Sequence, residues 1–176
     1  HNLKEYKKAI ENYDKAIQLN PNDSKSYNNR GNSYLELKEY KKAIEDYNNV
    51  IKIDSIDPHT YHNLGYAYFK LEEYKKAIIN YDKAIQLNPK FDIAYRNRGN
   101  AYFELRGYYK AIEDYDKAIE LDSNYTDAYW NRGNAYLELK EYNKAIEDYN
   151  KTIQLAPDFI YVYQNRGNAY YFLKEY

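Results

Sequence analysis

The chain has 176 residues, a formal charge of −1 and 30% charged residues. It is long enough for a folded domain, and no apolar stretch is long enough to span a membrane. The absence of Cys excludes disulfides and thiolate metal sites, and the near-neutral charge disfavours nucleic-acid binding, which requires a basic surface. We therefore expect a soluble protein without a membrane or nucleic-acid partner, in a compartment that stays open with the cytoplasm slightly favoured. Because the chain begins with His1 and contains no Met, we expect a fragment or a processed chain.

A 34-residue period runs through the whole sequence. Its clearest marker is a glycine that recurs without one insertion or deletion, at Gly31, Gly65, Gly99, Gly133 and Gly167. The period divides the chain into a half repeat 1–23, full repeats 24–57, 58–91, 92–125 and 126–159, and a half repeat 160–176. Because such repeats bury their apolar faces only against their neighbours, we predict one repeat domain over residues 1–176.

Each full repeat is predicted to form a first helix and a second helix, since apolar residues recur at helical spacing in two blocks. In the repeat 24–57 the first block is Tyr27, Gly31, Tyr34 and Leu37, and the second is Tyr40, Ala43, Ile44, Tyr47, Val50 and Ile51. Prolines that disfavour a preceding helical residue end several second helices, at Pro21, Pro89 and Pro157. The half repeat 1–23 holds only a second helix, and 160–176 only a first helix. The predicted fold is all-α, a solenoid of stacked antiparallel helix hairpins.

The repeat 58–91 carries a known signature. It comprises Tyr61, Leu64, Gly65, Tyr68, Ala77, Tyr81, Ala84 and Pro89. On these residues, repeated in register, the chain resembles the tetratricopeptide repeat (TPR) family over essentially its whole length. The resemblance implies a right-handed α-α superhelix, whose inner face is lined mainly by first helices and binds a peptide segment of another protein.

The repeating tyrosines and glycines are interpreted as packing residues. Twenty-one of the 26 Tyr residues fall in four columns at 34-residue steps, which start at Tyr6, Tyr13, Tyr27 and Tyr34. Each repeating glycine lies inside a first helix, where it costs about 1 kcal/mol relative to Ala. We expect a close approach between helices to offset that cost.

A column of arginines departs from the family pattern, in which Leu is common. It comprises Arg30, Arg98, Arg132 and Arg166, with Leu kept at Leu64. Sixteen residues downstream the Arg repeats have Asp46, Asp114 and Asp148, whereas the Leu repeat has Asn80. We predict that each Arg pairs with the Asp of its own repeat, because a charge near the core needs a partner. A phosphate-binding ladder of the four arginines is the alternative.

Two rows of asparagines follow the first helices. Row A comprises Asn29, Asn63, Asn97, Asn131 and Asn165; row B comprises Asn32, Asn100, Asn134 and Asn168 and is interrupted by Tyr66. An amide can bond both the N–H and the C=O of an extended peptide, so we interpret both rows as a peptide-binding surface. Row A resembles the asparagine ladder in the superhelix of the O-linked N-acetylglucosamine transferase, which implies that it holds extended polypeptide. The alternative left open is that these amides link neighbouring helices.

Variable positions on the same face are predicted to set selectivity. They are Lys25, His62, Arg96, Asp127, Trp130 and Gln164. An exposed Trp130 beside Arg96 is typical of an interaction hot spot. The acidic residues Glu36, Glu104 and Glu138 favour a ligand that carries Lys or Arg. The carboxylate clamp with which family members grip acidic chaperone tails is not expected, because Tyr161 and Asn165 stand where two cations are needed.

The favoured function is a scaffold that binds an extended peptide of a partner protein in an Asn-lined concave groove. The alternative is a structural module that self-associates head-to-tail, in which Tyr163, Tyr170 and Leu173 accept Tyr6, Ala9, Ile10 and Tyr13 of the next molecule. Neither an enzyme nor a cofactor is expected, because no nucleophile-base-acid arrangement stands out. His59 and His62 lack a third ligand, so no metal site is predicted. Acidic residues on the same face disfavour RNA binding.

Overall fold

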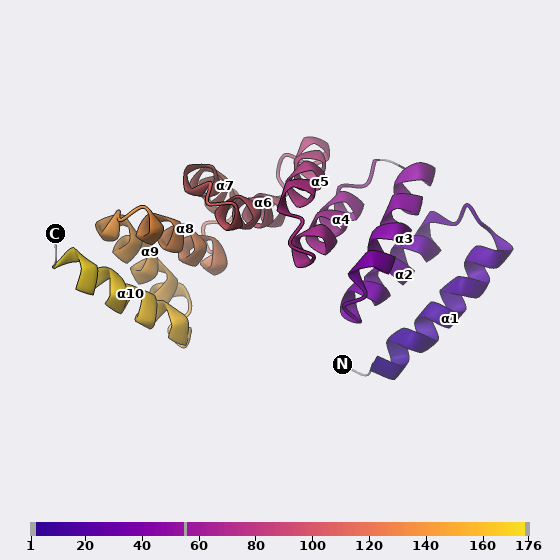
Figure 1. Ribbon diagram of the computed structural model, residues 1–176, viewed down its shortest axis with the longest axis horizontal. Coiled ribbons are helices and arrows are strands. Elements are labelled where there is room, and N and C mark those ends of the chain that lie inside the picture. The colour runs from indigo at the N-terminus through magenta and orange to yellow at the C-terminus, as the bar shows by residue number, and fades with distance from the viewer. Residues whose placement is uncertain (1–2, 55, 175–176) are drawn as a thin grey trace. The chain divides into compact units, whose positions relative to one another are not determined.

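The computed structural model describes residues 3–54 and 56–174, which fall into two compact units, His1–Pro89 and Lys90–Tyr176. The first unit contains α1 (Leu3–Leu19), α2 (Ser24–Glu36), α3 (Tyr40–Ile53), α4 (Pro58–Lys70) and α5 (Tyr74–Leu87). The second contains α6 (Asp92–Glu104), α7 (Tyr108–Leu121), α8 (Thr126–Glu138), α9 (Tyr142–Leu155) and α10 (Ile160–Leu173) (Figure 1). The predicted all-α fold is confirmed, and the boundary between the units falls close to a repeat boundary.

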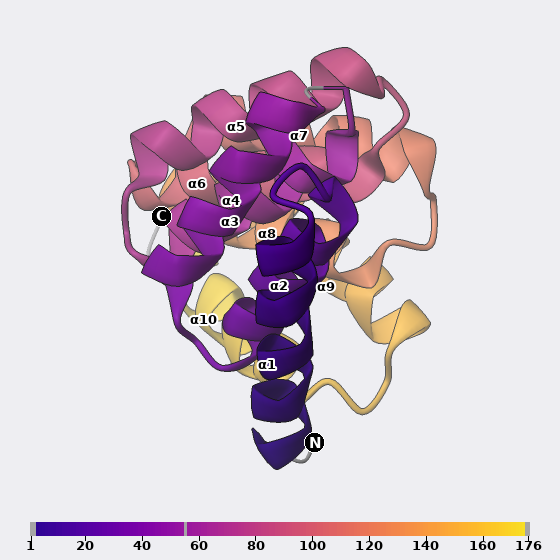
Figure 2. The same ribbon diagram turned by 90° about the vertical axis from the view of Figure 1, so that its right-hand side faces the viewer.

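The helices form antiparallel hairpins of the predicted kind. In the first unit α2 pairs with α3 and α4 with α5, while α1 lies along α2 and α3 packs on α4 (Figure 2). In the second unit α6 pairs with α7 and α8 with α9, while α7 packs on α8 and α9 on α10. Three second helices, α3, α7 and α9, are therefore each held between the first helix of their own repeat and the first helix of the next one.

The turn inside each hairpin is tight and contains a residue in the left-handed region. After α2, the backbone N–H of Lys38 donates to the Leu35 carbonyl at 2.9 Å, and that of Glu39 donates to the Tyr34 carbonyl at 2.8 Å. This pattern satisfies the last carbonyls of the helix and is usually built on glycine. Here the positive φ angles belong to larger residues, Lys38, Glu72, Arg106 and Lys140.

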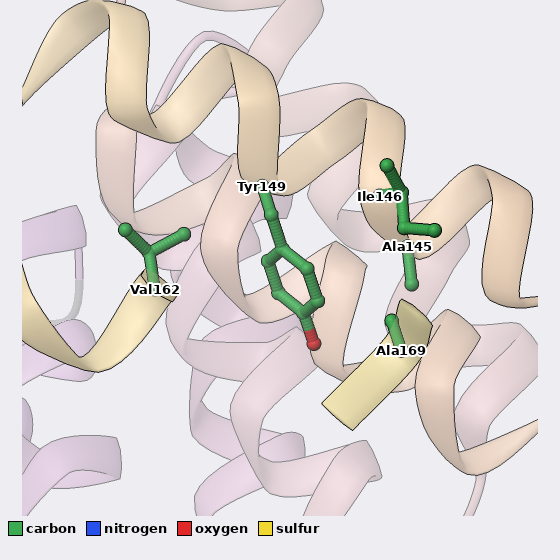
Figure 3. Close-up of a cluster of buried hydrophobic side chains, with 5 residues drawn as sticks. All are labelled: Ala145, Ile146, Tyr149, Val162 and Ala169. Carbon is green, nitrogen blue, oxygen red and sulfur yellow. The ribbon is translucent and has the colours of Figure 1, made fainter. Parts of the chain in front are cut away.

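A glycine of the first helix and a tyrosine of the second bring each hairpin together. A Cβ atom placed on Gly133 would lie 2.7 Å from the Tyr149 ring, and the other complete hairpins give 2.7–2.9 Å. Tyr149 is fully buried, among Ala145, Ile146, Val162 and Ala169 (Figure 3). The expected close approach between helices is confirmed, and the ring that fills it supplies the apolar burial that offsets the cost of glycine in a helix.

Candidate functional site

The two asparagine rows lie on the first helices, as predicted. In the first unit α2 carries Asn29 and Asn32 and α4 carries Asn63; in the second α6 carries Asn97 and Asn100, α8 carries Asn131 and Asn134, and α10 carries Asn165 and Asn168. Rows A and B are three residues apart, which places them on one side of each helix. They therefore share a face with the variable positions.

Row B amides are junctions between three helices. The side-chain oxygen of Asn100 on α6 accepts a hydrogen bond from the Tyr115 hydroxyl on α7 at 2.8 Å. It also accepts one from the Asn131 amide nitrogen on α8 at 2.9 Å. The same oxygen thus ties a first helix to its own second helix and to the first helix of the next repeat.

The same arrangement recurs at two other row B positions, Asn134 and Asn32. Asn134 accepts from Tyr149 at 2.9 Å and from Asn165 at 2.7 Å, and Asn32 accepts from Tyr47 at 2.6 Å and from Asn63 at 3.1 Å. The alternative in which the amides link neighbouring helices is therefore what the structure shows for these six residues. These bonds hold each amide in one orientation. The amide N–H and C=O groups that make no internal bond are therefore also fixed in position.

The other three asparagines of the rows differ in exposure. Asn97 is nearly buried, with 7% of its surface exposed. Asn29 on α2 and Asn168 on α10 are exposed, and no side-chain bond of either is described within residues 3–54 and 56–174. Tyr66 takes the row B position on α4, so the junction seen at Asn32 has no amide counterpart on that helix.

The arginine column pairs with the aspartates predicted for it. Arg132 on α8 donates from Nε and Nη2 to the two carboxylate oxygens of Asp148 on α9, at 2.8 and 2.6 Å. Arg30 makes the same bidentate contact with Asp46, and Arg98 makes it with Asp114. Burial raises the pKa of the Asp148 carboxyl, and the bonds from Arg132 counter part of that shift. Because the Nε–Nη2 edge of the guanidinium is already on a carboxylate, Arg30, Arg98 and Arg132 do not form an open phosphate-binding ladder.

Three of the arginines, Arg30, Arg132 and Arg166, also reach back to the preceding second helix, a contact that the sequence analysis missed. Nη1 of Arg132 donates to Asp116 at 2.5 Å, and Nη1 of Arg30 donates to Asp14 at 2.6 Å. Arg166 makes the equivalent bond to the Asn150 side chain at 2.6 Å. The signal was available, because an acidic or amide residue stands 16 positions upstream of each of these arginines as well as downstream.

The structure differs from the expected hot spot at Trp130. Trp130 is half-buried and packs edge-on against Phe159 on the same unit, with ring centroids 5.1 Å apart. Its indole nitrogen is buried and has no hydrogen-bond partner among the residues that the structure describes. The expectation of an exposed Trp130 is therefore wrong, because α10 and the residues before it cover much of the ring.

Arg96 is engaged by its own unit. Its Nε donates to the Tyr125 hydroxyl at 3.0 Å, its guanidinium lies over that ring, and Nη2 is 3.9 Å from the Asp127 carboxylate. Two of the predicted selectivity residues therefore partly neutralise each other. Lys25 and Gln164 are exposed, and His62 is half-buried with Nδ1 3.1 Å from the Asn63 oxygen.

Family models identify the chain. The model described as "TPR repeat" matches residues 1–38, 31–72, 65–105 and 108–140, and the model described as "Tetratricopeptide repeat" matches residues 126–159. The chain belongs to the tetratricopeptide repeat family. This TPR chain has, in the part that the structure describes, no helix long and apolar enough to cross a membrane.

Solved structures of other TPR proteins are similar. The crystal structure of MamA is 28% identical, over 85% of this chain and 88% of that one, with a TM-score of 0.83. The structure of YrrB, described as a TPR protein with an unusual peptide-binding site, is 25% identical over 93% of this chain and 84% of that one, with a TM-score of 0.82. The first TPR of Spaghetti (RPAP3), bound to the HSP90 peptide SRMEEVD, is 30% identical over 69% of this chain and 96% of that one, with a TM-score of 0.66. A search of curated protein sequences gives no significant match.

Proposed function

We propose that this TPR chain is a scaffold that binds an extended segment of a partner protein along the first-helix face. The family is one of protein–protein interaction modules, typically without enzymatic activity. The observation that carries the proposal is the fixed orientation of the row A and row B amides, which project from one side of successive first helices.

The amides keep bonding capacity after their internal bonds are made. Asn131 donates one of its two N–H groups to Asn100, which leaves one N–H and its own oxygen. Asn100 receives two bonds on its oxygen, which leaves its N–H groups. An extended peptide presents one donor and one acceptor per residue, so neighbouring amides of rows A and B can bond its backbone without reading its side chains. Because the amides are already ordered, little conformational entropy is lost on binding.

The charge of the face favours a different ligand from the acidic peptide of the RPAP3 complex. Arg96 is partly neutralised by Asp127, and Tyr161 and Asn165 are not cations. Three exposed carboxylates lie at the ends of first helices, Glu36, Glu104 and Glu138. The partner segment is therefore expected to be extended and to carry Lys or Arg, with Lys25, His62, Trp130 and Gln164 contributing to selectivity.

A peptide-library screen tests this function. We would measure binding by Trp130 fluorescence and repeat each hit with Asn131→Ala plus Asn165→Ala, expecting affinity to fall about tenfold to a hundredfold because several backbone bonds are lost. These substitutions also remove the links to Asn100 and Asn134, so a matched control is needed. Tyr149→Phe removes another bond to Asn134 from a fully buried position and is expected to leave affinity unchanged. Hits that bind the double variant as tightly as the unaltered chain would contradict the proposal.

A further inference from the structure

Two neighbouring positions of the first-helix face differ on α4 from the other full repeats. The helices α2, α6 and α8 each carry a row B Asn followed four residues later by Glu, namely Asn32 and Glu36, Asn100 and Glu104, and Asn134 and Glu138. On α4 the same positions hold Tyr66 and Lys70. Residues four apart lie on one side of a helix, so both share the face of the row A residue Asn63. An amide and an anion are thus replaced there by a ring and a cation.

Tyr66 and Lys70 are in contact with each other. The Lys70 ammonium nitrogen lies 5.2 Å from the centroid of the Tyr66 ring. The ring is half-buried, whereas Lys70 is exposed. Attraction between a cation and an aromatic face restricts the long lysine side chain. The ring is therefore anchored in the fold, and it holds an ammonium group that a ligand can still reach.

The charge of Lys70 differs from that of most other lysines that lie over a tyrosine ring. Lys42, Lys76 and Lys144 make the same ring contact, but each of them also pairs with a Glu three residues earlier in the chain. Three residues before Lys70 stands Ala67, which is fully buried. In the part of the chain that the structure describes, no carboxylate lies within ion-pair distance of Lys70. Its charge is therefore available to an anionic group of a ligand.

The spacing of α2 and α4 sets how far apart their charged ends lie along a bound segment. The Asn63 amide on α4 donates to the Asn32 oxygen on α2 at 3.1 Å, so the two first helices are in contact. Axes of helices in contact are about 8–10 Å apart. An extended chain covers that distance in about three residues. A ligand residue at Glu36 on α2 and another at Lys70 on α4 are thus about three positions apart.

We propose that α4 reads one side chain of the partner segment. Lys70, held over Tyr66, binds the carboxylate of an Asp or Glu that lies about three residues from a Lys or Arg at Glu36. This inference rests on the proposed function, because it concerns the segment bound along the first-helix face. The other row B amides hold a peptide backbone whatever its sequence, whereas the ring in their place on α4 can pack against the methylene groups of an acidic side chain. The face therefore selects a segment of mixed charge over one that is entirely basic or entirely acidic.

Peptide selection and a charge swap test the proposal. A display library of random peptides is selected on the unaltered chain, and the expected binders contain Asp or Glu about three positions from Lys or Arg. One binder, and the same peptide with its acidic residue replaced by Lys, are then titrated against the unaltered chain and against Lys70→Glu. Each mismatched combination is expected to bind about threefold to tenfold more weakly, and the doubly reversed combination to regain the affinity.

Two further variants separate a local effect from a change in overall charge. Tyr66→Asn with Lys70→Glu gives α4 the pair found on α2, and it is expected to select Lys or Arg where the unaltered chain selects Asp or Glu. Lys110→Glu is the matched control. Lys110 is exposed and lies 5.4 Å from the Tyr102 ring, but it belongs to the second helix α7. This control is expected to bind the selected peptides with unaltered affinity and the same preference.

The outcomes distinguish this inference from the proposed function. Binders without enrichment of Asp or Glu, or a doubly reversed combination that regains no affinity, would overturn the role of Lys70 and leave peptide binding intact. Failure of every peptide to bind the unaltered chain would overturn both. Lys70 also ends α4, where the helix dipole favours a cation, so Lys70→Glu is checked for folding by circular dichroism. A purely structural role of Lys70 would weaken both peptides equally and would not produce the charge swap.

Discussion

Arg132 lies between two carboxylates of different exposure. It holds both oxygens of Asp148, whose side chain is 6% exposed, and one oxygen of Asp116, whose side chain is 52% exposed. The two contacts share one cation but differ in how much water surrounds the anion. Their contributions to stability should therefore differ as well, because an exposed ion pair is screened by solvent.

We predict that Asp148→Asn lowers the free energy of unfolding by about 3 kcal/mol, since it leaves the inner edge of a partly buried cation without its anion. Asp116→Asn is predicted to cost less than about 1 kcal/mol. Urea unfolding followed by circular dichroism measures both. The control is Arg132→Leu with Asp148→Asn, a combination that occurs naturally as Leu64 and Asn80. Its cost should be smaller than the sum of the single costs, and strict additivity would contradict the pairing.

Replacing glycine by alanine is predicted to change stability in opposite directions at two equivalent positions of the glycine column. Gly133→Ala is predicted to lower stability by about 1–2 kcal/mol, because the new Cβ would lie 2.7 Å from the Tyr149 ring. Gly167→Ala is predicted to raise it by up to about 1 kcal/mol, since nothing lies within 4 Å and Ala favours the helix. Thermal unfolding at low protein concentration measures both. If both substitutions changed stability in the same direction, the close approach of the tyrosine ring would not be the reason for glycine at these positions.

The left-handed turn residue offers a stabilising change. Lys38 has φ 59°, a conformation that costs a side-chain-bearing residue roughly 1 kcal/mol. Lys38→Gly is predicted to raise the free energy of unfolding by about 0.5–1 kcal/mol, and Lys38→Val to lower it, because a β-branched residue fits this region worst. The denaturant midpoints of unfolding of the two variants measure which of them is more stable. Equal midpoints for Gly and Val would mean that the turn changes its conformation to suit the residue.

Buried tyrosines predict a loss of stability at alkaline pH. Burial raises the pKa of Tyr47, Tyr115 and Tyr149 above the ordinary value of 10.0. In the unfolded chain these groups ionise near pH 10, so the folded state binds more protons above that pH. Stability is therefore fully present below pH 10 and falls as pH rises towards the raised pKa values, by about 1.4 kcal/mol per pH unit for each buried Tyr.

Urea unfolding at several pH values, with tyrosinate absorbance as a second probe, measures this dependence. Tyr149→Phe is the matched variant: it loses the bond to Asn134, and its stability should fall less steeply above pH 10. A slope unchanged by this substitution would show that Tyr149 already ionises in the folded state.

The sequence predicts the hairpins and the pairing inside each of them. The strict period places Gly133 opposite Tyr149, and the joint change to Leu64 and Asn80 reveals the Arg–Asp pair. Both signals arise because the partners belong to one repeat and vary together. The same reasoning missed Asp116, which belongs to the preceding repeat; the equivalent residue is Asn150 before Arg166, so the upstream position follows the Arg less strictly than the downstream one.

The candidate site was predicted less completely. The sequence places Asn131 on the right helix face, but its bond to Asn100 depends on the spacing between successive first helices, which a repeat pattern does not contain. Trp130 was expected to be exposed, and it is half-buried because Phe159 packs against it. A position in a helix predicts which neighbours a side chain faces, and it does not predict how much of the side chain they cover.

The polar links that repeat along the chain join residues at the same few separations in sequence. The Tyr–Asn bonds span 15 residues, the Arg bonds span 16, and the Asn–Asn bonds span 31. A change in length by one residue inside a repeat would therefore break links on both sides of it. Gain or loss of a whole 34-residue segment would preserve every one of them. Duplication or deletion of a gene segment that encodes one whole repeat would thus keep these links, whereas insertion or deletion of a single codon within a repeat would not.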